Sequence, residues 1–237
     1  MHRESFFENL RQSLDKGRSK SPNLWNPNSE QETRDQVQVI LDSSETLWEE
    51  RYENIIETAR KAGWNVARVV TLEDLIEYIE CLVQEKQATK VVFTSQTAVR
   101  ELGLDKVFGQ SQIEFTEIND SSNISPADLR AKAIQADIGI TGVEFAVAET
   151  GTCVLTAGSD TGRLVGLAPP VHVAIVTKGQ VLDSLDDLFK IRKSQKIDGN
   201  FPAYSNLISG PSRSADIEYT LVTGVHGPGE VHMILVG

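Results

Sequence analysis

The residues of this chain best suited to chemistry lie between positions 209 and 214, where a glycine and a proline precede two serines and an arginine. An apolar, strand-like run leads into this segment, and we expect a helix over residues 216–222 directly after it. Backbone N–H groups at a helix start attract anions, and hydroxyl and guanidinium groups add strong donors. The segment therefore predicts a pocket for a carboxylate or a phosphate. Its candidate ligand contacts are Ser209, Gly210, Ser212, Arg213 and Ser214.

The acids that follow offer an alternative interpretation of this segment. Asp216 and Glu218 fall in the first turn of the expected helix, where carboxylates satisfy the helix dipole themselves. They could also pair with Arg213. In that case the segment is a capped helix start with a local ion pair, and it holds no ligand.

A second candidate segment places an acid and a threonine before a glycine turn into a buried strand. In open α/β sheets, ligands gather at strand ends. Glu149 is therefore a candidate catalytic base or substrate-orienting carboxylate, and Thr150 and Gly151 are candidate substrate contacts. The alternative is a solvated turn acid beside a glycine that is needed for backbone geometry.

Two further segments carry one candidate each. Arg163 lies in a long loop between two apolar strands, where it is the natural contact for a carboxylate or phosphate, or else an ordinary surface arginine. His226 is held among glycines and a proline; it is a candidate acid–base group, or else a turn histidine bonded to a carbonyl. His172, at the start of an apolar strand, is expected to be a hydrogen-bonded core residue.

The elements that must position these residues alternate between helix and strand in the first two thirds of the chain. This order predicts an α/β fold with a mainly parallel sheet flanked by helices. The C-terminal part has more strands than helices and predicts a mixed portion. We expect one domain over residues 32–237, preceded by an N-terminal helix and polar linker arm over residues 1–31. Helices are expected over residues 32–62, 72–83, 97–102, 126–136, 184–193 and 216–222, and strands over 66–70, 90–94, 113–115, 138–141, 152–157, 171–176, 207–209 and 231–236.

Composition excludes several classes of function. A net charge of -11 argues against nucleic acid or an anionic membrane as a partner. The sequence contains no secretory signal and no apolar run long enough to span a membrane, so we expect a cytoplasmic protein. Cys81 and Cys153 are expected to be buried, and two thiols cannot supply the four ligands of an ordinary cubane cluster. No histidine spacing indicates a metal site, and no glycine-rich nucleotide motif is present.

Taken in order, these segments resemble the lactate utilization protein C family, whose domain is called the LUD domain. The resemblance is carried by residues 149–152, by Arg163 with Pro169, Pro170 and His172, by residues 209–218 and by residues 224–228. It implies a fold like the sugar-phosphate isomerase and CoA-transferase superfamily. It also implies a subunit without cofactor in a complex that oxidises L-lactate to pyruvate, in which two partner proteins carry iron–sulfur clusters.

Two other functions stay open at this point. The fold analogy and the anion loop also suit a self-contained enzyme or sensor for a phosphorylated or CoA-linked metabolite, with Glu149 as the reacting group. A purely structural scaffold, which docks partners through its acidic surface and N-terminal arm, is the third hypothesis.

Overall fold

The computed structural model describes residues 28–100, 103, 113–119, 124–156, 162–215 and 221–237. Its centre is a six-stranded sheet in which every neighbouring pair is parallel. Most positions of the middle strands are buried, and valine and isoleucine are the commonest buried residues there, which is typical of a parallel sheet covered on both faces. The order across the sheet is β1 (Asn65–Val69), β12 (Glu230–Val236), β7 (Val171–Thr177), β4 (Ile138–Gly142), β2 (Lys90–Thr94) and β3 (Glu114–Ile118).

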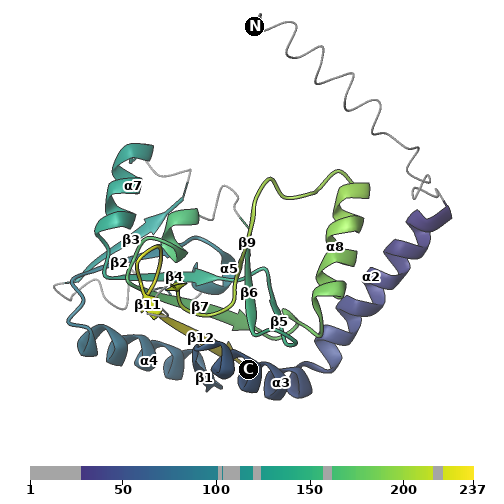
Figure 1. Cartoon of the computed structure of the whole chain (residues 1–237), viewed down its shortest axis with the longest axis horizontal. Coiled ribbons are helices and arrows are strands. Elements are labelled where there is room, and N and C mark those ends of the chain that lie inside the picture. Colours follow the sequence, from purple (N-terminus) through teal and green to yellow (C-terminus); the bar gives the residue numbers. More distant parts are fainter. Residues whose placement is uncertain (1–27, 101–102, 104–112, 120–123, 157–161, 216–220) are drawn as a thin grey trace, which may run out of the picture.

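Helices cover both faces of this sheet (Figure 1). One face packs against α4 (Leu72–Glu85) and α5 (Thr97–Arg100). The other packs against α3 (Trp48–Ala62) and, further along, against α7 (Pro126–Gln135) and the 3-10 helix η1 (Arg163–Gly166). The α/β fold with a mainly parallel sheet is thus confirmed.

A second sheet lies against the same face as α3. It has four strands in the order β8 (Val181–Leu182), β5 (Phe145–Val147), β6 (Thr152–Thr156) and β9 (Ser205–Ile208). Its β5–β8 pair is parallel and its β5–β6 and β6–β9 pairs are antiparallel. Two helices cover its outer side, α2 (Asn28–Thr46) and α8 (Leu185–Ile197), and they lie side by side in Figure 1. The mixed portion predicted for the C-terminal part is therefore a separate sheet.

The helix predicted over residues 216–222 is wrong at its C-terminal end. Leu221–Thr223 forms strand β11, which pairs antiparallel with β10 (Arg213–Ala215); residues 216–220 lie outside the described part of the chain. The local sequence favours a helix, but antiparallel pairing with β10 places Leu221–Thr223 in a strand. The segment from position 209 to 214 therefore runs into a strand at Arg213–Ala215.

The long helix predicted over residues 32–62 is two helices, α2 and α3, separated at Leu47. The Ser43, Ser44 and Thr46 hydroxyls donate to carbonyls three or four residues earlier, which weakens and bends a helix. The second helix ends at Gly63 as expected, with a φ of 100°. Helix α2 begins within the predicted arm, whereas the predicted N-terminal helix lies outside the described residues.

Local start signals are confirmed where the sequence contains a full cap. Thr71 and Asp74 form both bonds of a capping box, and the Ser125 hydroxyl accepts from the Asp128 backbone N–H.

Of the two cysteines, Cys153 is buried as expected, but Cys81 is exposed on the outer side of α4, which corrects the prediction. No helix in the described ranges is both long and apolar enough to cross a membrane.

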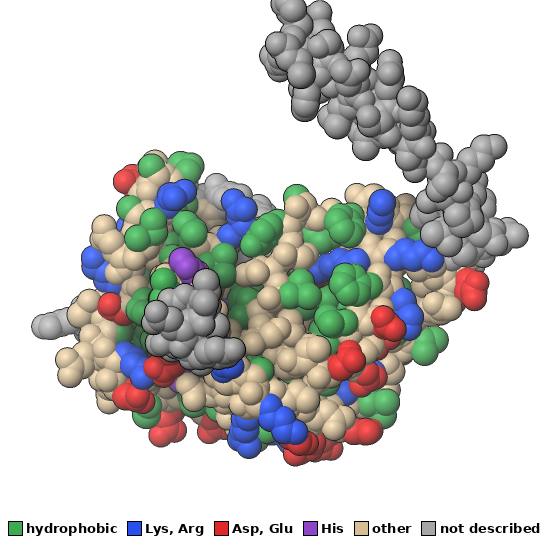
Figure 2. All heavy atoms as spheres, in the orientation of Figure 1, with side chains coloured by type: hydrophobic (Ala, Val, Ile, Leu, Met, Phe, Trp, Pro, Cys, Tyr) green, Lys and Arg blue, Asp and Glu red, His purple; other side chains and the backbone are tan. Residues whose placement is uncertain are grey.

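Charge is unevenly spread over the surface. Figure 2 shows acidic side chains along the lower edge, over α3 and α4, and basic and hydrophobic side chains together over α8. The negative net charge of the chain is thus a poor guide to the charge of any single pocket.

Candidate functional site

A narrow pocket lies where the carboxyl end of β4 meets the second sheet. Ligands of open α/β sheets gather at this edge. It has room for about one water-sized group, and most of its lining residues have polar side chains, although the surface that they expose to the pocket is mainly apolar. The lining residues are Thr141 from β4, Leu155 and Thr156 from β6, Gly162 and Arg163 at the start of η1, and Tyr204 and Asn206 at the start of β9.

Arg163 supplies the charge of this pocket. Its guanidinium carbon lies 5.0 Å from the centre of the Tyr204 ring, a cation–π arrangement between two lining residues. Within the described part of the chain, no ion pair joins Arg163 to a carboxylate. A planar guanidinium without such a partner is suited to bind a carboxylate or phosphate ligand.

One wall of the pocket is stiffened by a part-buried ion pair. Arg192 of α8 donates to both carboxylate oxygens of Glu144, at 2.8 and 2.7 Å, and to the Thr156 hydroxyl at 3.1 Å. Thr156 in turn donates to Glu144. Burial alone raises the pKa of Glu144, but the bonds from Arg192 and Thr156 outweigh it and hold the pKa below its usual range. The carboxylate is thus ionised and neutralised by Arg192, so it does not cancel the charge of Arg163.

A buried histidine lies behind the pocket. The Nε2 atom of His172 is 2.8 Å from the Thr141 hydroxyl, and the ring is fully buried. Burial, together with the nearby His232, lowers the pKa of His172 to about 3, so the ring is neutral at physiological pH. The expectation of a hydrogen-bonded core histidine is confirmed.

The Glu149–Thr152 turn is held by structural contacts. The Glu149 carboxylate accepts from the backbone N–H of Leu185, the first residue of α8. Gly151 has a φ of 60°, and a Cβ at this position would lie 2.6 Å from the backbone of Ala59 in α3. The backbone of Gly151 also accepts a bond from the Trp64 indole N–H at 2.9 Å. The predicted catalytic role of Glu149 stays a prediction, whereas its observed contact is at a helix start.

Three hydroxyl groups, two from this turn and one from Ser209 directly after β9, form a chain. Thr150 and Thr152 hydroxyls are 2.7 Å apart, and those of Thr152 and Ser209 are 2.6 Å apart. The structure therefore brings two of the predicted contacts, Thr150 and Ser209, together through a third hydroxyl. These side chains do not line the pocket of Arg163.

The predicted anion loop lies on the C-terminal end of α3. Arg213 donates to the Ala62 carbonyl oxygen at 2.9 Å, and Gly210 (φ 103°) passes so close that a Cβ would be 2.2 Å from the same oxygen. This end of a helix carries partial negative charge, which attracts Arg213 and disfavours an anion. Residues 216–220 lie outside the described part of the chain, so an anion pocket at a helix start there stays a prediction, and the observed partner of Arg213 is a backbone carbonyl.

The glycine-rich loop of His226 packs on this same segment. The Ser212 backbone N–H donates to the Pro228 carbonyl at 2.8 Å, and the Ser212 carbonyl accepts from Gly224 at 2.9 Å. Ser214 lies in β10 and pairs with Val222. The His226 side chain is exposed. These segments of the sequence therefore form one surface, but His226 does not line the pocket of Arg163.

Comparison with known proteins identifies the family. A family model described as the LUD domain matches residues 52–236. Lactate utilization protein C of Halalkalibacterium halodurans is 30% identical over 228 residues, which cover 95% of this chain and 94% of that protein. Lactate utilization protein C 1 of Bacillus mycoides is 36% identical over 171 residues, which cover 70% of each chain. The chain belongs to the lactate utilization protein C family.

A solved structure agrees with this fold. The LUD-domain chain matches a DUF162 family protein from Deinococcus radiodurans with a TM-score of 0.53 and 22% identity, over 79% of this chain and 97% of that one. At this identity the likeness supports the fold alone. The position of the functional site has to be argued from the residues of this family member itself.

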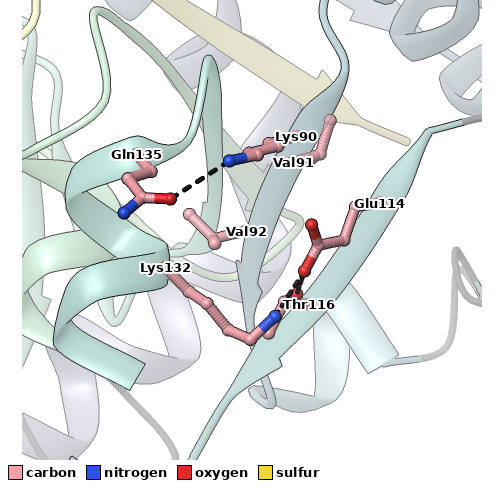
Figure 3. A pocket seen from close by; sticks show the side chains of 7 residues that line it. All are labelled: Lys90, Val91, Val92, Glu114, Thr116, Lys132 and Gln135. Atoms are coloured by element: carbon pink, nitrogen blue, oxygen red, sulfur yellow. Dashed lines mark hydrogen bonds and ion pairs between the residues drawn. The ribbon is translucent and has the colours of Figure 1, made fainter. Parts of the chain in front are cut away.

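A second hollow in this LUD-domain protein is less suited to a ligand. Figure 3 shows Lys90 turned toward Gln135, and Lys132 turned toward Glu114 and Thr116, on either side of Val92. Lys132 forms an ion pair with Glu114, and Lys90 donates to Gln135 at 3.1 Å. The hollow also adjoins the last turn of α7, whose partial negative charge favours lysines and disfavours anions. We therefore assign the candidate site to the pocket of Arg163.

Several residues of that pocket were missed by sequence reasoning. Thr141, Tyr204 and Asn206 belong to strands or strand ends that carry no motif, and their neighbours in space are distant in sequence. The bond between Glu144 and Arg192 spans 48 positions and has no local signature. Only Arg163 was predicted, because an arginine in a long loop between two apolar strands can be recognised from the sequence alone.

Proposed function

We propose that this chain takes part in lactate utilization as the subunit without cofactor of a complex that oxidises L-lactate to pyruvate. Within it, the pocket of Arg163 binds the carboxylate of the acid. Support for the first part comes from family membership and from the names of relatives that align with nearly the whole chain. Support for the second part comes from one observation, a guanidinium at the carboxyl end of the parallel sheet that no described carboxylate pairs with.

The chemistry of the pocket suits a small acid. L-Lactate and pyruvate are carboxylates, and a guanidinium binds this group through two parallel hydrogen bonds. The ionised Glu144 is matched by Arg192, so Arg163 gives the lining of described residues a net positive charge. The hollow has room for about one water-sized group, which admits a single oxygen of a small acid and leaves no room for a nucleotide or coenzyme A.

Oxidation of lactate to pyruvate releases two electrons and two protons, so the complex needs an electron acceptor. The two cysteines of this chain do not suit an iron–sulfur cluster, since Cys153 is buried within β6 and Cys81 is exposed on α4. We therefore propose two iron–sulfur partner proteins as the acceptors, and we derive no electron-transfer step within this chain.

Reconstitution with the two partner proteins tests this proposal. We expect lactate oxidation to require the chain, and Arg163→Ala to lower kcat/KM by roughly 30-fold, as expected when a charged hydrogen bond to substrate is lost. Arg163→Lys should recover only part of this loss, because an ammonium group cannot bind a carboxylate in the same bidentate way. Arg130→Ala, at an exposed arginine of α7, is the matched control.

The proposal fails if the partners oxidise lactate equally well without this chain. Assembly of the complex, followed by size-exclusion chromatography, separates the two parts of the proposal. If Arg163→Ala leaves both assembly and kcat/KM unchanged, the chain is a scaffold and the carboxylate assignment is wrong.

A further inference from the structure

We infer that Thr141 recognises an oxygen on C2 of the acid whose carboxylate binds Arg163. The site would then select 2-hydroxy and 2-oxo acids over acids that carry no oxygen at C2. This inference rests on the carboxylate assignment made in the proposed function, but it does not depend on the complex. It concerns two residues, Thr141 and His172, of which the first lines the pocket and the second lies behind it.

Thr141 keeps hydrogen-bonding capacity that its protein neighbours do not use. A threonine hydroxyl has one donor and two acceptor positions. Its bond within the described structure runs to Nε2 of His172, at 2.8 Å, and the side chain is 1% exposed at the floor of the pocket. When Nε2 carries the ring proton, it donates to the Thr141 hydroxyl, which keeps its own proton to donate to a ligand oxygen from the pocket side.

His172 holds this hydroxyl in one orientation. Its ring is wedged against Gly166, where a Cβ would lie 3.2 Å from Nε2, and it faces the Trp64 ring at a centroid distance of 6.2 Å. Its Nδ1 atom is buried and has no partner among the described residues. Burying Nδ1 without a partner lowers the stability of the fold, and an isoleucine or valine at position 172 would avoid this cost. A histidine here is therefore explained only if Nε2 has a role. The 2.8 Å bond indicates that this role is to orient the Thr141 hydroxyl.

The other hydroxyl from a strand in this pocket is already engaged. Thr156 donates to Glu144 and accepts from Arg192, so it has no proton left to donate to a ligand oxygen. The guanidinium of Arg163 covers the ring face of Tyr204, and no hydrogen bond within the described structure orients the Tyr204 hydroxyl. Thr141 is thus the hydroxyl at the floor of the pocket that is oriented and still able to bond, next to a cation that suits the carboxylate. An acid with an oxygen on the adjacent carbon fits such a pair of groups.

Three acids of the same length test the inference. Calorimetric titration of the isolated chain would compare pyruvate, L-lactate and propionate, which differ only at C2. We expect pyruvate and L-lactate to bind about tenfold more tightly than propionate, which corresponds to one hydrogen bond to the C2 oxygen. Thr141→Val should remove this difference while the Kd of propionate stays within about twofold. Thr141→Ser should retain the difference.

Matched variants separate recognition from damage to the fold. Thr116→Val, at a buried threonine of β3 that lines the other hollow, should change no Kd. Arg163→Ala should weaken all three acids alike. The ratio of the pyruvate and propionate affinities is the decisive quantity, because a purely structural role of Thr141 would leave this ratio unchanged.

Two results would overturn the inference. One is a Thr141→Val variant in which all three acids weaken by the same factor or by none. The other is inorganic phosphate that binds in an Arg163-dependent manner while none of the acids does. Neither result bears on whether the complex needs this chain, so loss of the complex activity and loss of acid discrimination can be told apart.

Discussion

Arg213 and Ala62 are 151 positions apart in the sequence, yet the Arg213 guanidinium donates a hydrogen bond of 2.9 Å to the Ala62 carbonyl oxygen. The bond closes the last turn of α3, where carbonyl groups have no partner within the helix. A residue that looked like an anion ligand therefore has a structural contact at the opposite, negative end of a helix.

We expect Arg213→Ala to lower the free energy of unfolding by about 0.5–1 kcal/mol, through loss of this bond and of the favourable charge at the helix end. Urea unfolding monitored by tryptophan fluorescence would measure the change, with Arg130→Ala as the control. The Kd for small acids should be unaffected. If Arg213→Ala weakened acid binding as much as Arg163→Ala does, Arg213 would be part of the binding site and this prediction would be wrong.

Gly151 should be among the positions least tolerant of substitution in the described structure. In Gly151→Ala a Cβ would lie 2.6 Å from the Ala59 backbone, in addition to the strain of a φ of 60°. We expect a loss of about 3 kcal/mol or more, from overpacking combined with backbone strain.

Gly199→Ala is the matched control for this prediction. Gly199 has a φ of 75°, and a Cβ added there would have no described atom within 4 Å, so this variant reports backbone strain alone. Its expected cost is about 1 kcal/mol. Equal losses in the two variants would show that the contact with α3 is not tight.

The ion pair between Glu144 and Arg192 should make stability fall in acid. The pKa of Glu144 is held below its usual range, so its contribution is present above the pKa of the unfolded chain and is lost as the pH falls through the lower, folded pKa. In Glu144→Gln this part of the pH dependence should be absent. The variant should also lose roughly 2–3 kcal/mol at neutral pH, because Arg192 keeps a buried charge without its partner. Chemical unfolding at pH 7 and at pH 4 measures both effects.

His172 should shift stability in a higher pH range. Its pKa is about 3 in the folded chain and close to the ordinary 6.5 when unfolded, so the unfolded state takes up the proton first. Stability is therefore fully present above pH 6.5 and falls by about 1.4 kcal/mol for each unit below it. His172→Gln should flatten the curve between pH 6.5 and 5. A His172 ring that titrates near pH 6.5 in the folded protein, seen by NMR, would contradict the buried neutral state.

Sequence reasoning succeeded where the determining contacts are local. The caps at Thr71 and Ser125 and the helix end at Gly63 depend on residues within one turn, and all three are as expected. It failed at Leu221–Thr223, which was expected to end a helix but pairs with Arg213–Ala215 as a strand. It also could not assemble the pocket, because Thr141, Arg163 and Tyr204 meet only through the packing of two sheets.

One stretch of chain, residues 204–213, links three separate parts of the fold. It begins at the pocket with Tyr204, joins the hydroxyl chain through Ser209 and ends on α3 with Arg213. Segments connected in this way tend to open as one cooperative unit in the native state. Fraying of β9 would thus release the pocket wall and the helix end together, and an acid bound at Arg163 should slow amide hydrogen exchange as far away as the last turn of α3.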